Sequence, residues 1–293
     1  MQSNKEGINM KRTDIKMTPF LENFLNFDLG HMNEERFINK IKDINYVDDL
    51  NLDIYYPDIQ KEQYPVFLII YGGGWASGFK TDKFVEPMLK PLEYGYACVV
   101  ADYTLSLDAQ FPKAVIDLKY AIDFIHKNKD KYHFDDENIT VWGESAGGHL
   151  GLECCLLPNE CLNINVNSKV KNMVIFYPPT NALTIDNYTS SMGKNLHEES
   201  VFGIFMGSHL HDEEYLKMAS PINYVHEGMP NLWLQHGLND QLVPYQQSLE
   251  LIEKVKDFNI KFYYELKEEK VHTDPYFFSD NNVKRMIDFI EKE

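Results

Sequence analysis

The chain has 293 residues, of which 44% are apolar and 25% are charged. That length fits one large α/β domain, and the composition is close to the globular average, so a disordered or fibrous chain is excluded. The formal net charge of -17 argues against nucleic acid and anionic membranes as partners, because both are bound through clustered lysine and arginine. A neutral small molecule suits this charge better than a strongly anionic one.

The N-terminal stretch, MQSNKEGINMKRTDIKM, lacks the apolar segment that a secretory signal needs. The sequence contains no run of about 18 apolar residues, so it predicts no membrane span. We therefore expect a cytoplasmic protein. The cysteines lack the spacing of zinc ligands, and we expect buried free thiols in a reducing compartment. They are Cys98, Cys154, Cys155 and Cys161.

The N-terminal residues 1–43 are polar and charged, except for one apolar cluster. Its members are Phe20, Leu21, Phe24, Leu25 and Phe27. Their spacing fits a short amphipathic helix. Such a helix either packs on the outside of the domain or forms a cap over an acyl pocket, and the sequence leaves both open.

Strand and helix signals alternate from about residue 44 to the end of the chain. Strands are expected at 51–57, 65–71, 96–103, 137–144, 172–178, 231–237 and 260–266. Helices are expected at about 81–93, from Pro112 to 125, from 149 to 157, and at about 244–257 and 282–292. Because most of these strands are apolar throughout, the pattern predicts a mostly parallel sheet with helices on both faces. Residues 181–220 have no clear period and predict an insertion with short helices inside the 44–293 domain.

The strongest local motif is Gly143-Glu144-Ser145-Ala146-Gly147-Gly148, between an apolar strand and a helical stretch. This is the G-x-S-x-G pattern in its strand–turn–helix setting. Glycines at 143 and 147 relieve the crowding of a tight turn, which then projects the Ser145 hydroxyl above the sheet. The N–H of Ala146 would lie at the positive end of the following helix, where it can bind an oxyanion.

A second motif, Tyr71-Gly72-Gly73-Gly74-Trp75, follows the buried strand at 65–71. Three glycines at the end of a strand allow the backbone to approach a ligand closely. Their N–H groups can point at developing negative charge. A phosphate-binding loop is disfavoured, because no Lys-Ser/Thr pair follows and G-x-G-x-x-G is absent.

These motifs resemble the α/β-hydrolase superfamily, in the esterase group with a His-Gly-Gly-Gly-Trp loop and a Gly-x-Ser-Ala-Gly-Gly elbow. The likeness covers roughly residues 44–291 and includes DYTLS (102–106), FPKAVIDLKYAIDFI (111–125), ASPINYV (219–225) and HGLNDQLVPYQQS (236–248). The chain is similar to bacterial carbohydrate-acetyl and feruloyl esterases, and more distantly to hormone-sensitive-lipase-like carboxylesterases and kynurenine formamidases. Tyr71 stands where this group usually has histidine, which leaves loop geometry and acyl specificity open.

The resemblance implies an α/β-hydrolase fold and a triad in the chain order Ser, Asp, His. Ser145 is then the nucleophile, Asp240 the acid and His272 the base. Gly73, Gly74 and Ala146 are the candidate oxyanion hole. His149 and His236 are expected to be structural.

The substrate pocket is predicted less sharply by the sequence. Trp75 and Tyr71 are its candidate lining residues, together with Glu144. The turn is expected to aim Glu144 away from the substrate, with its charge still acting on the field of the site. No metal or organic cofactor is expected.

The expected function is hydrolysis of short-chain, acetyl or aryl-acyl esters through an acyl-enzyme, with an acylated sugar as one possible substrate. An amidase or formamidase with the same triad is the first alternative, because the chemistry of the two is shared. A non-catalytic binding module of the same fold is the second, although such a protein would be expected to lose Ser145, Asp240 or His272.

Overall fold

The structure is a computed structural model that describes residues 19–190 and 195–292. Its strands form one eight-stranded sheet in the order β1-β2-β4-β3-β5-β6-β7-β8. The strands are β1 (Lys40–Val47), β2 (Leu50–Tyr55), β3 (Tyr64–Ile70), β4 (Ala97–Ala101), β5 (Phe134–Glu144), β6 (Asn172–Phe176), β7 (Asn231–Gly237) and β8 (Phe262–Lys267). From β4 to β8 every neighbouring pair is parallel, whereas β1–β2 and β2–β4 are antiparallel. This mostly parallel sheet confirms the predicted fold class.

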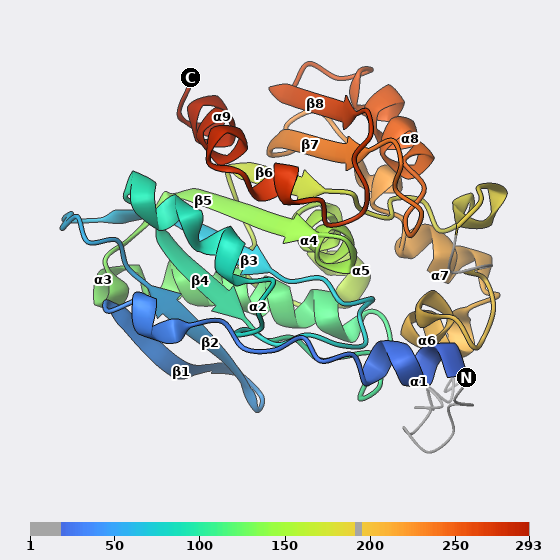
Figure 1. Ribbon diagram of the computed structural model, residues 1–293, viewed down its shortest axis with the longest axis horizontal. Helices are drawn as coiled ribbons and strands as arrows, with labels where there is room; N and C mark the ends of the chain where they lie inside the picture. The colour runs from blue at the N-terminus through green and yellow to red at the C-terminus, as the bar shows by residue number, and fades with distance from the viewer. Residues whose placement is uncertain (1–18, 191–194, 293) are drawn as a thin grey trace.

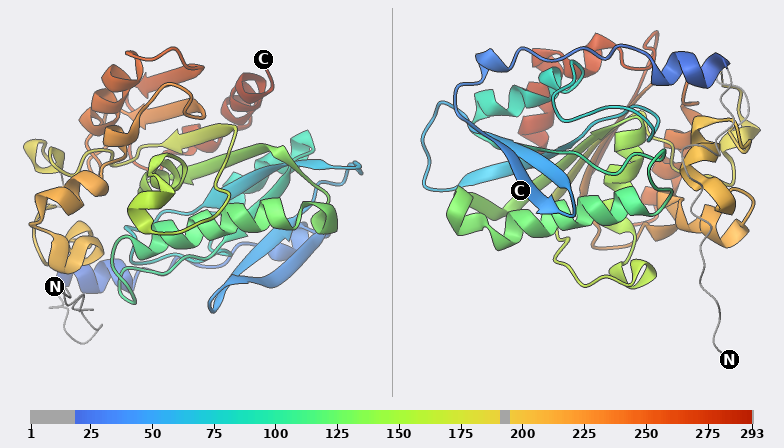
Figure 2. Two further views of the ribbon diagram at one scale, coloured as in Figure 1. Left: turned by 180° about the vertical axis from the view of Figure 1, so that it is seen from behind. Right: turned by 90° about the horizontal axis from the view of Figure 1, so that it is seen from below.

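Helices cover both faces of the sheet (Figures 1 and 2). The α-helices are α1 (Pro19–Leu25), α2 (Lys113–Lys127), α3 (Lys129–Tyr132), α4 (Ala146–Leu156), α5 (Asn159–Leu162), α6 (Val201–Met206), α7 (Glu213–Met218), α8 (Gln246–Val255) and α9 (Asp280–Glu291). The 3₁₀ helices are η2 (Glu34–Arg36), η3 (Glu86–Tyr94), η4 (Ile185–Asn187), η5 (Gly207–His209), η6 (Pro221–Tyr224) and η7 (Pro275–Phe278). Helices α2 and α4 pack together against β5, and α9 packs against η3 and β7.

The parallel strands end at one edge of the sheet, beyond which α1, α6 and α7 gather (Figure 1). In open α/β sheets, ligands bind outside the carboxyl ends of the strands. The residues of β4 and β6 are all buried, as their continuous apolar sequences predict. None of the helices in the described part of the chain is long and apolar enough to cross a membrane.

Strand β1 was not expected from the sequence. It begins at Lys40, inside the stretch assigned to the N-terminal extension, and its residues alternate between half-buried and exposed for most of its length. The strand lies at the edge of the sheet, where it pairs only with β2 among the described strands. An edge strand can therefore be polar on one face, and its sequence KIKDINYV lacks the apolar run by which the inner strands were recognised.

The helix expected at 81–93 is wrong in type and in its start. Residues 86–94 form the 3₁₀ helix η3, which contains Pro91. Proline has no N–H to donate, so a regular α-helical ladder cannot run through this residue. Before η3 the chain turns around Asp82, whose Oδ1 accepts hydrogen bonds from the N–H groups of Phe84 and Val85.

The cysteines are free, as expected, but not all of them are buried. Cys98 and Cys154 are buried, Cys155 is half-buried and Cys161 is exposed. Cys161 lies in α5, a one-turn helix that leads from α4 toward β6. A short connecting helix on the surface has no apolar periodicity to reveal which of its side chains face solvent.

Candidate active site

Ser145 stands on the sharp turn between β5 and α4. Its backbone has φ 54° and ψ −124°, a conformation that costs a non-glycine residue energy and is typical of functional sites. The N–H of Ser145 donates to the carbonyl of Phe176 at 2.9 Å, which anchors the turn to β6. A Cβ on Gly143 would collide with the carbonyl of Gly147, so the turn requires glycine there, as the motif predicts.

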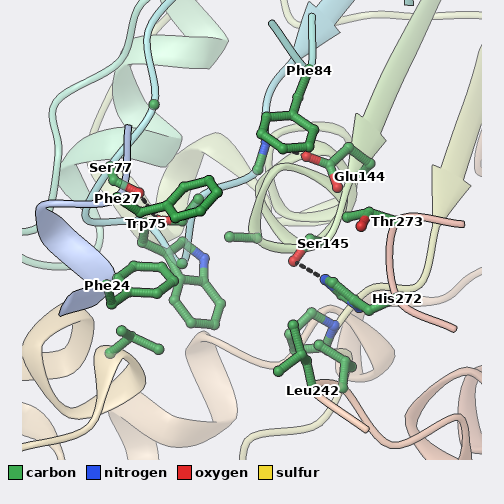
Figure 3. Close-up of a pocket in the computed structure, with 18 of the residues that line it drawn as sticks. Phe24, Phe27, Trp75, Ser77, Phe84, Glu144, Ser145, Leu242, His272 and Thr273 are labelled. Carbon is green, nitrogen blue, oxygen red and sulfur yellow. Dashed lines mark hydrogen bonds between the residues drawn. The ribbon is translucent and has the colours of Figure 1, made fainter. Parts of the chain in front are cut away.

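His272 lies between Ser145 and Asp240, although the three residues come from distant parts of the sequence. Its Nε2 is 2.8 Å from Oγ of Ser145 (Figure 3). Its Nδ1 is 2.6 Å from Oδ2 of Asp240. A carboxylate can only accept, so Nδ1 carries the proton and Nε2 is left to accept from the serine hydroxyl. The ring of Tyr177 packs against the imidazole, with 4.6 Å between centroids.

The carboxylate of Asp240 is buried and accepts hydrogen bonds on both oxygens. Oδ1 receives the N–H groups of Leu242 and Val243, each at 2.9 Å. Oδ2 faces His272 and lies 3.2 Å from Nε2 of His236. Burial raises the pKa of Asp240, but the hydrogen bonds from His236 and His272 outweigh it and hold this pKa well below the usual range. The group is therefore an anion at neutral pH.

His236 was predicted to be structural, and it also contacts the carboxylate of Asp240. Its Nδ1 is 2.7 Å from Oγ of Ser248, and its Nε2 is 2.9 Å from the carbonyl of Val243. A carbonyl only accepts, so Nε2 carries the proton that also faces Asp240. The spacing of four residues in His-Gly-Leu-Asn-Asp is the only sequence signal for this contact, and it is weak in a loop.

Three backbone N–H groups at the cavity over Ser145 are the candidates for an oxyanion site. Among the described residues, the N–H groups of Gly73, Gly74 and Ala146 have no hydrogen-bond partner. Ala146 begins α4, whose N-terminus carries positive partial charge. Gly73 has φ 105° and Gly74 φ 58°, which side chains rarely adopt. The loop therefore needs its glycines, as the sequence predicts.

Two side chains support this loop from behind. Oε1 of Glu144 accepts a hydrogen bond of 2.7 Å from the N–H of Gly72. Nε1 of Trp75 donates to Nδ1 of His149 at 3.1 Å, and Nε2 of His149 lies 3.0 Å from the carbonyl of Ala219. His149 is thus a packing residue, as predicted. It also ties residues 72–75, which we call the oxyanion loop after its candidate role, to α4.

A cavity of about 350 Å³ opens over Ser145. Trp75 and Glu144 line it, as predicted, although Glu144 turns its carboxyl back to the loop backbone. Tyr71 does not line this cavity, which corrects its prediction as a pocket residue. The ring of Tyr71 is buried, stacks on Tyr103 at 4.6 Å between centroids, and has its hydroxyl 3.2 Å from Oδ1 of Asp102.

The carboxyl of Glu144 is buried next to the catalytic candidates. Burial raises its pKa, against the opposing electrostatic effect of His272 and the effects of the N–H of Gly72 and the hydroxyl of Tyr177. No group of three or more His, Cys, Asp or Glu side chains within the described ranges could hold a metal ion.

The N-terminal segment contributes to the same cavity. Phe24, Phe27 and Leu29 all line it. Phe24 lies across the cavity from His272 (Figure 3). The sequence left packing and capping open for this apolar cluster, and Phe20 and Leu21 of the cluster have side chains outside the described set.

Comparison with known proteins places this chain in a family. The BD-FAE family matches residues 52–255. Among curated proteins, the chain is 29% identical to esterase LipQ of Mycobacterium tuberculosis (strain ATCC 25618 / H37Rv) over 189 residues, covering 63% of this chain and 44% of LipQ. It is also 29% identical to the probable carboxylic ester hydrolase LipM of the same strain over 197 residues, covering 66% of this chain and 45% of LipM. The chain thus spans less than half the length of these two relatives.

Solved structures agree on the fold. A truncated carbohydrate esterase from gut microbiota superposes with a TM-score of 0.77 at 24% identity, covering 89% of this chain and 98% of the other. A bifunctional GH43-CE protein of Bacteroides eggerthii gives 0.76 at 28% identity, covering 86% of this chain and 37% of the other. These findings confirm the resemblance predicted from the two glycine-rich motifs. The chain belongs to the BD-FAE family of α/β-hydrolase esterases.

Proposed function

We propose that this chain hydrolyses short-chain carboxylic esters, with acetyl or aryl-acyl groups, through Ser145, His272 and Asp240. The observation that carries the proposal is the position of one imidazole, which reaches the serine hydroxyl at 2.8 Å and the carboxylate at 2.6 Å. A nucleophile, a base within hydrogen-bond reach and a group that orients the base are the parts that acyl transfer needs.

In the proposed reaction, His272 takes the hydroxyl proton while Oγ of Ser145 attacks the carbonyl carbon. The carbonyl oxygen becomes an anion that the N–H groups of Gly73, Gly74 and Ala146 would bind. The C–O bond to the alcohol then breaks, and His272 gives its proton to the departing oxygen. Water attacks the acyl-serine in the same way, and its proton returns through His272 to Oγ of Ser145. The scheme uses no metal or organic cofactor.

The size of the cavity supports a small acyl group. About 350 Å³ is at the lower end for small-molecule sites, and Phe24, Trp75 and Val201 among its lining residues are apolar. The likeness to a carbohydrate esterase and to a GH43-CE protein supports an acylated sugar as the natural ester. A neutral substrate also agrees with the strongly negative charge of the chain.

The test is hydrolysis of p-nitrophenyl acetate, butyrate and octanoate by the wild type and by Ser145→Ala. We expect turnover of the short esters by the wild type and loss of turnover in the variant, with fluorophosphonate labelling of the wild type alone. Turnover of an N-formyl aryl amine without turnover of esters would move the assignment to a formamidase. A folded wild type with neither turnover nor label would overturn the proposal in favour of a binding module.

A further inference from the structure

The ring of Phe24 rests directly on Gly74 of the oxyanion loop, although the two residues lie 50 positions apart in the sequence. A Cβ built on Gly74 would lie 2.8 Å from Cζ of Phe24 and 3.5 Å from Cβ of Val201. Gly74 therefore leaves room for a ring from α1 and for a side chain from α6. The three residues lie together at one wall of the cavity that contains Ser145.

The geometry of a tetrahedral intermediate decides which part of the ester meets this wall. The reacting carbon carries Oγ of Ser145, the oxyanion, the departing alcohol and the acyl chain. The alcohol oxygen must lie near Nε2 of His272 to receive its proton, and the oxyanion must face the loop N–H groups. The acyl chain is left on the side away from His272. Figure 3 shows Phe24 across the cavity from His272, beside Trp75.

The segment that carries Phe24 is anchored to the rest of the domain just after α1. Met32 N–H donates to the carbonyl of Thr81 at 2.9 Å, and His31 forms a β-bridge with Asp82. Gly30 precedes them with φ 61°. The ring of Phe24 is thus placed by a tether outside the sheet, and its size can be changed without changing the strands that position Ser145.

The rim of this wall is open to solvent. Phe27 lines the cavity as well, yet its side chain is 62% exposed. Phe24 and Phe27 thus form an apolar part of the cavity lining, in which Phe24 is the half-buried ring and Phe27 the exposed one.

We propose that Phe24 limits the acyl-chain length that the site accepts, favouring acetyl over longer straight chains. This inference depends on the proposed esterase function. Phe24, a side chain from the N-terminal helix, bounds this side of the cavity and packs on the loop that would bind the oxyanion. Removal of the ring would enlarge the cavity on this side, and a larger ring would narrow it.

The test compares kcat/KM for p-nitrophenyl acetate, butyrate and octanoate among the wild type, Phe24→Ala, Phe24→Leu and Phe24→Trp. Two substrates that differ by one methylene in a complementary apolar pocket differ in kcat/KM by roughly tenfold or more. We expect Phe24→Ala to raise the butyrate-to-acetate ratio roughly tenfold, Phe24→Leu to raise it less, and Phe24→Trp to lower it. Asn23→Ala is the matched control, because Asn23 is an exposed neighbour on the same helix.

The outcomes separate this inference from the esterase proposal. If the wild type cleaves acetate and Ser145 is labelled, but the Phe24 variants keep the wild-type chain-length ratios, the inference is overturned and the esterase proposal stands. If the wild type cleaves no ester and takes no label, both fall. Circular dichroism shows which variants fold, and a failure of Phe24→Ala to fold leaves Phe24→Leu and Phe24→Trp, whose opposite shifts decide the question.

Discussion

The indole of Trp75 donates a hydrogen bond of 3.1 Å to Nδ1 of His149, and both side chains are buried. Indole N–H can only donate and the carbonyl of Ala219 can only accept, so the histidine must be the neutral Nε2–H tautomer. Burial favours this form and lowers the pKa of His149 to about 4. The oxyanion loop is therefore held to α4 by a histidine that stays uncharged at neutral pH.

We expect His149→Phe to destabilise the fold by about 1–3 kcal/mol, because it leaves a buried indole N–H without an acceptor. Trp75→Phe removes the donor, and the double variant removes both partners, so its cost should be well below the sum of the single costs. Urea unfolding of the four proteins measures this coupling. Additive costs would contradict the proposed tie between the loop and α4.

Asp240→Asn should lower kcat for p-nitrophenyl acetate by about 10³–10⁴-fold. Oδ1 of the new side chain would keep the N–H groups of Leu242 and Val243. The NH₂ group would then face Nδ1 of His272 and force its proton onto Nε2, so the imidazole could no longer accept from Ser145.

The matched control for this prediction is Asp274→Asn, two residues after His272. Asp274 accepts the N–H of Tyr276 through Oδ1, an interaction that asparagine can keep. We expect this variant to retain wild-type turnover. If Asp240→Asn retains more than a tenth of the turnover, or if Asp274→Asn loses much of it, then Asp240 is not the acid that orients His272.

The elements that the sequence predicted well are those whose signal is local. Ser145 was found because the elbow motif lies between an apolar strand and a helix, and that setting is encoded within about 20 consecutive residues. Asp240 and His272 follow β7 and β8, two of the strands that the sequence identified. Parallel strands end at one edge, so side chains placed just after them are brought together by the fold class itself.

The contacts that the sequence missed are tertiary. Nothing near Phe24 indicates that its ring rests on Gly74, because that contact depends on how a separate helix docks. Tyr71 was expected in the pocket from its neighbours in the sequence, but its ring turns behind the loop to stack on Tyr103. The ring direction of a residue at a strand end is set by what packs there, and a motif does not contain that information.

Glu144 provides a prediction about the support of the oxyanion loop. Glu144→Gln keeps an oxygen that can accept from the N–H of Gly72, whereas Glu144→Ala removes it. We expect Gln to retain most of the turnover and Ala to lower kcat by roughly 10–100-fold, with a smaller effect on KM, because the loop N–H groups act on the transition state. Steady-state kinetics on p-nitrophenyl acetate measures the effects on kcat and on KM separately. Equal losses in Gln and Ala would show that the charge, rather than the hydrogen bond, matters.

Glu153 is buried in α4, and neither of its carboxyl oxygens is hydrogen-bonded to any described residue. Burial raises the pKa of Glu153 well above its usual value, although the charge of Lys119 opposes this. A carboxyl with a raised pKa in the folded state stabilises the fold below the unfolded pKa of about 4.5, and this contribution is lost as pH rises toward the folded pKa. The wild type should therefore lose up to about 1.4 kcal/mol per pH unit from this group above pH 4.5.

Glu153→Gln cannot ionise, so its stability relative to the wild type should increase steadily between about pH 5 and pH 7. Urea unfolding at several pH values in this range measures the difference. Glu160→Gln on the neighbouring α5 removes one negative charge from an exposed position and controls for the change in net charge. A stability difference between Glu153→Gln and the wild type that stays constant over this range would mean that Glu153 is ionised in the native protein, with Lys119 as its counter-charge.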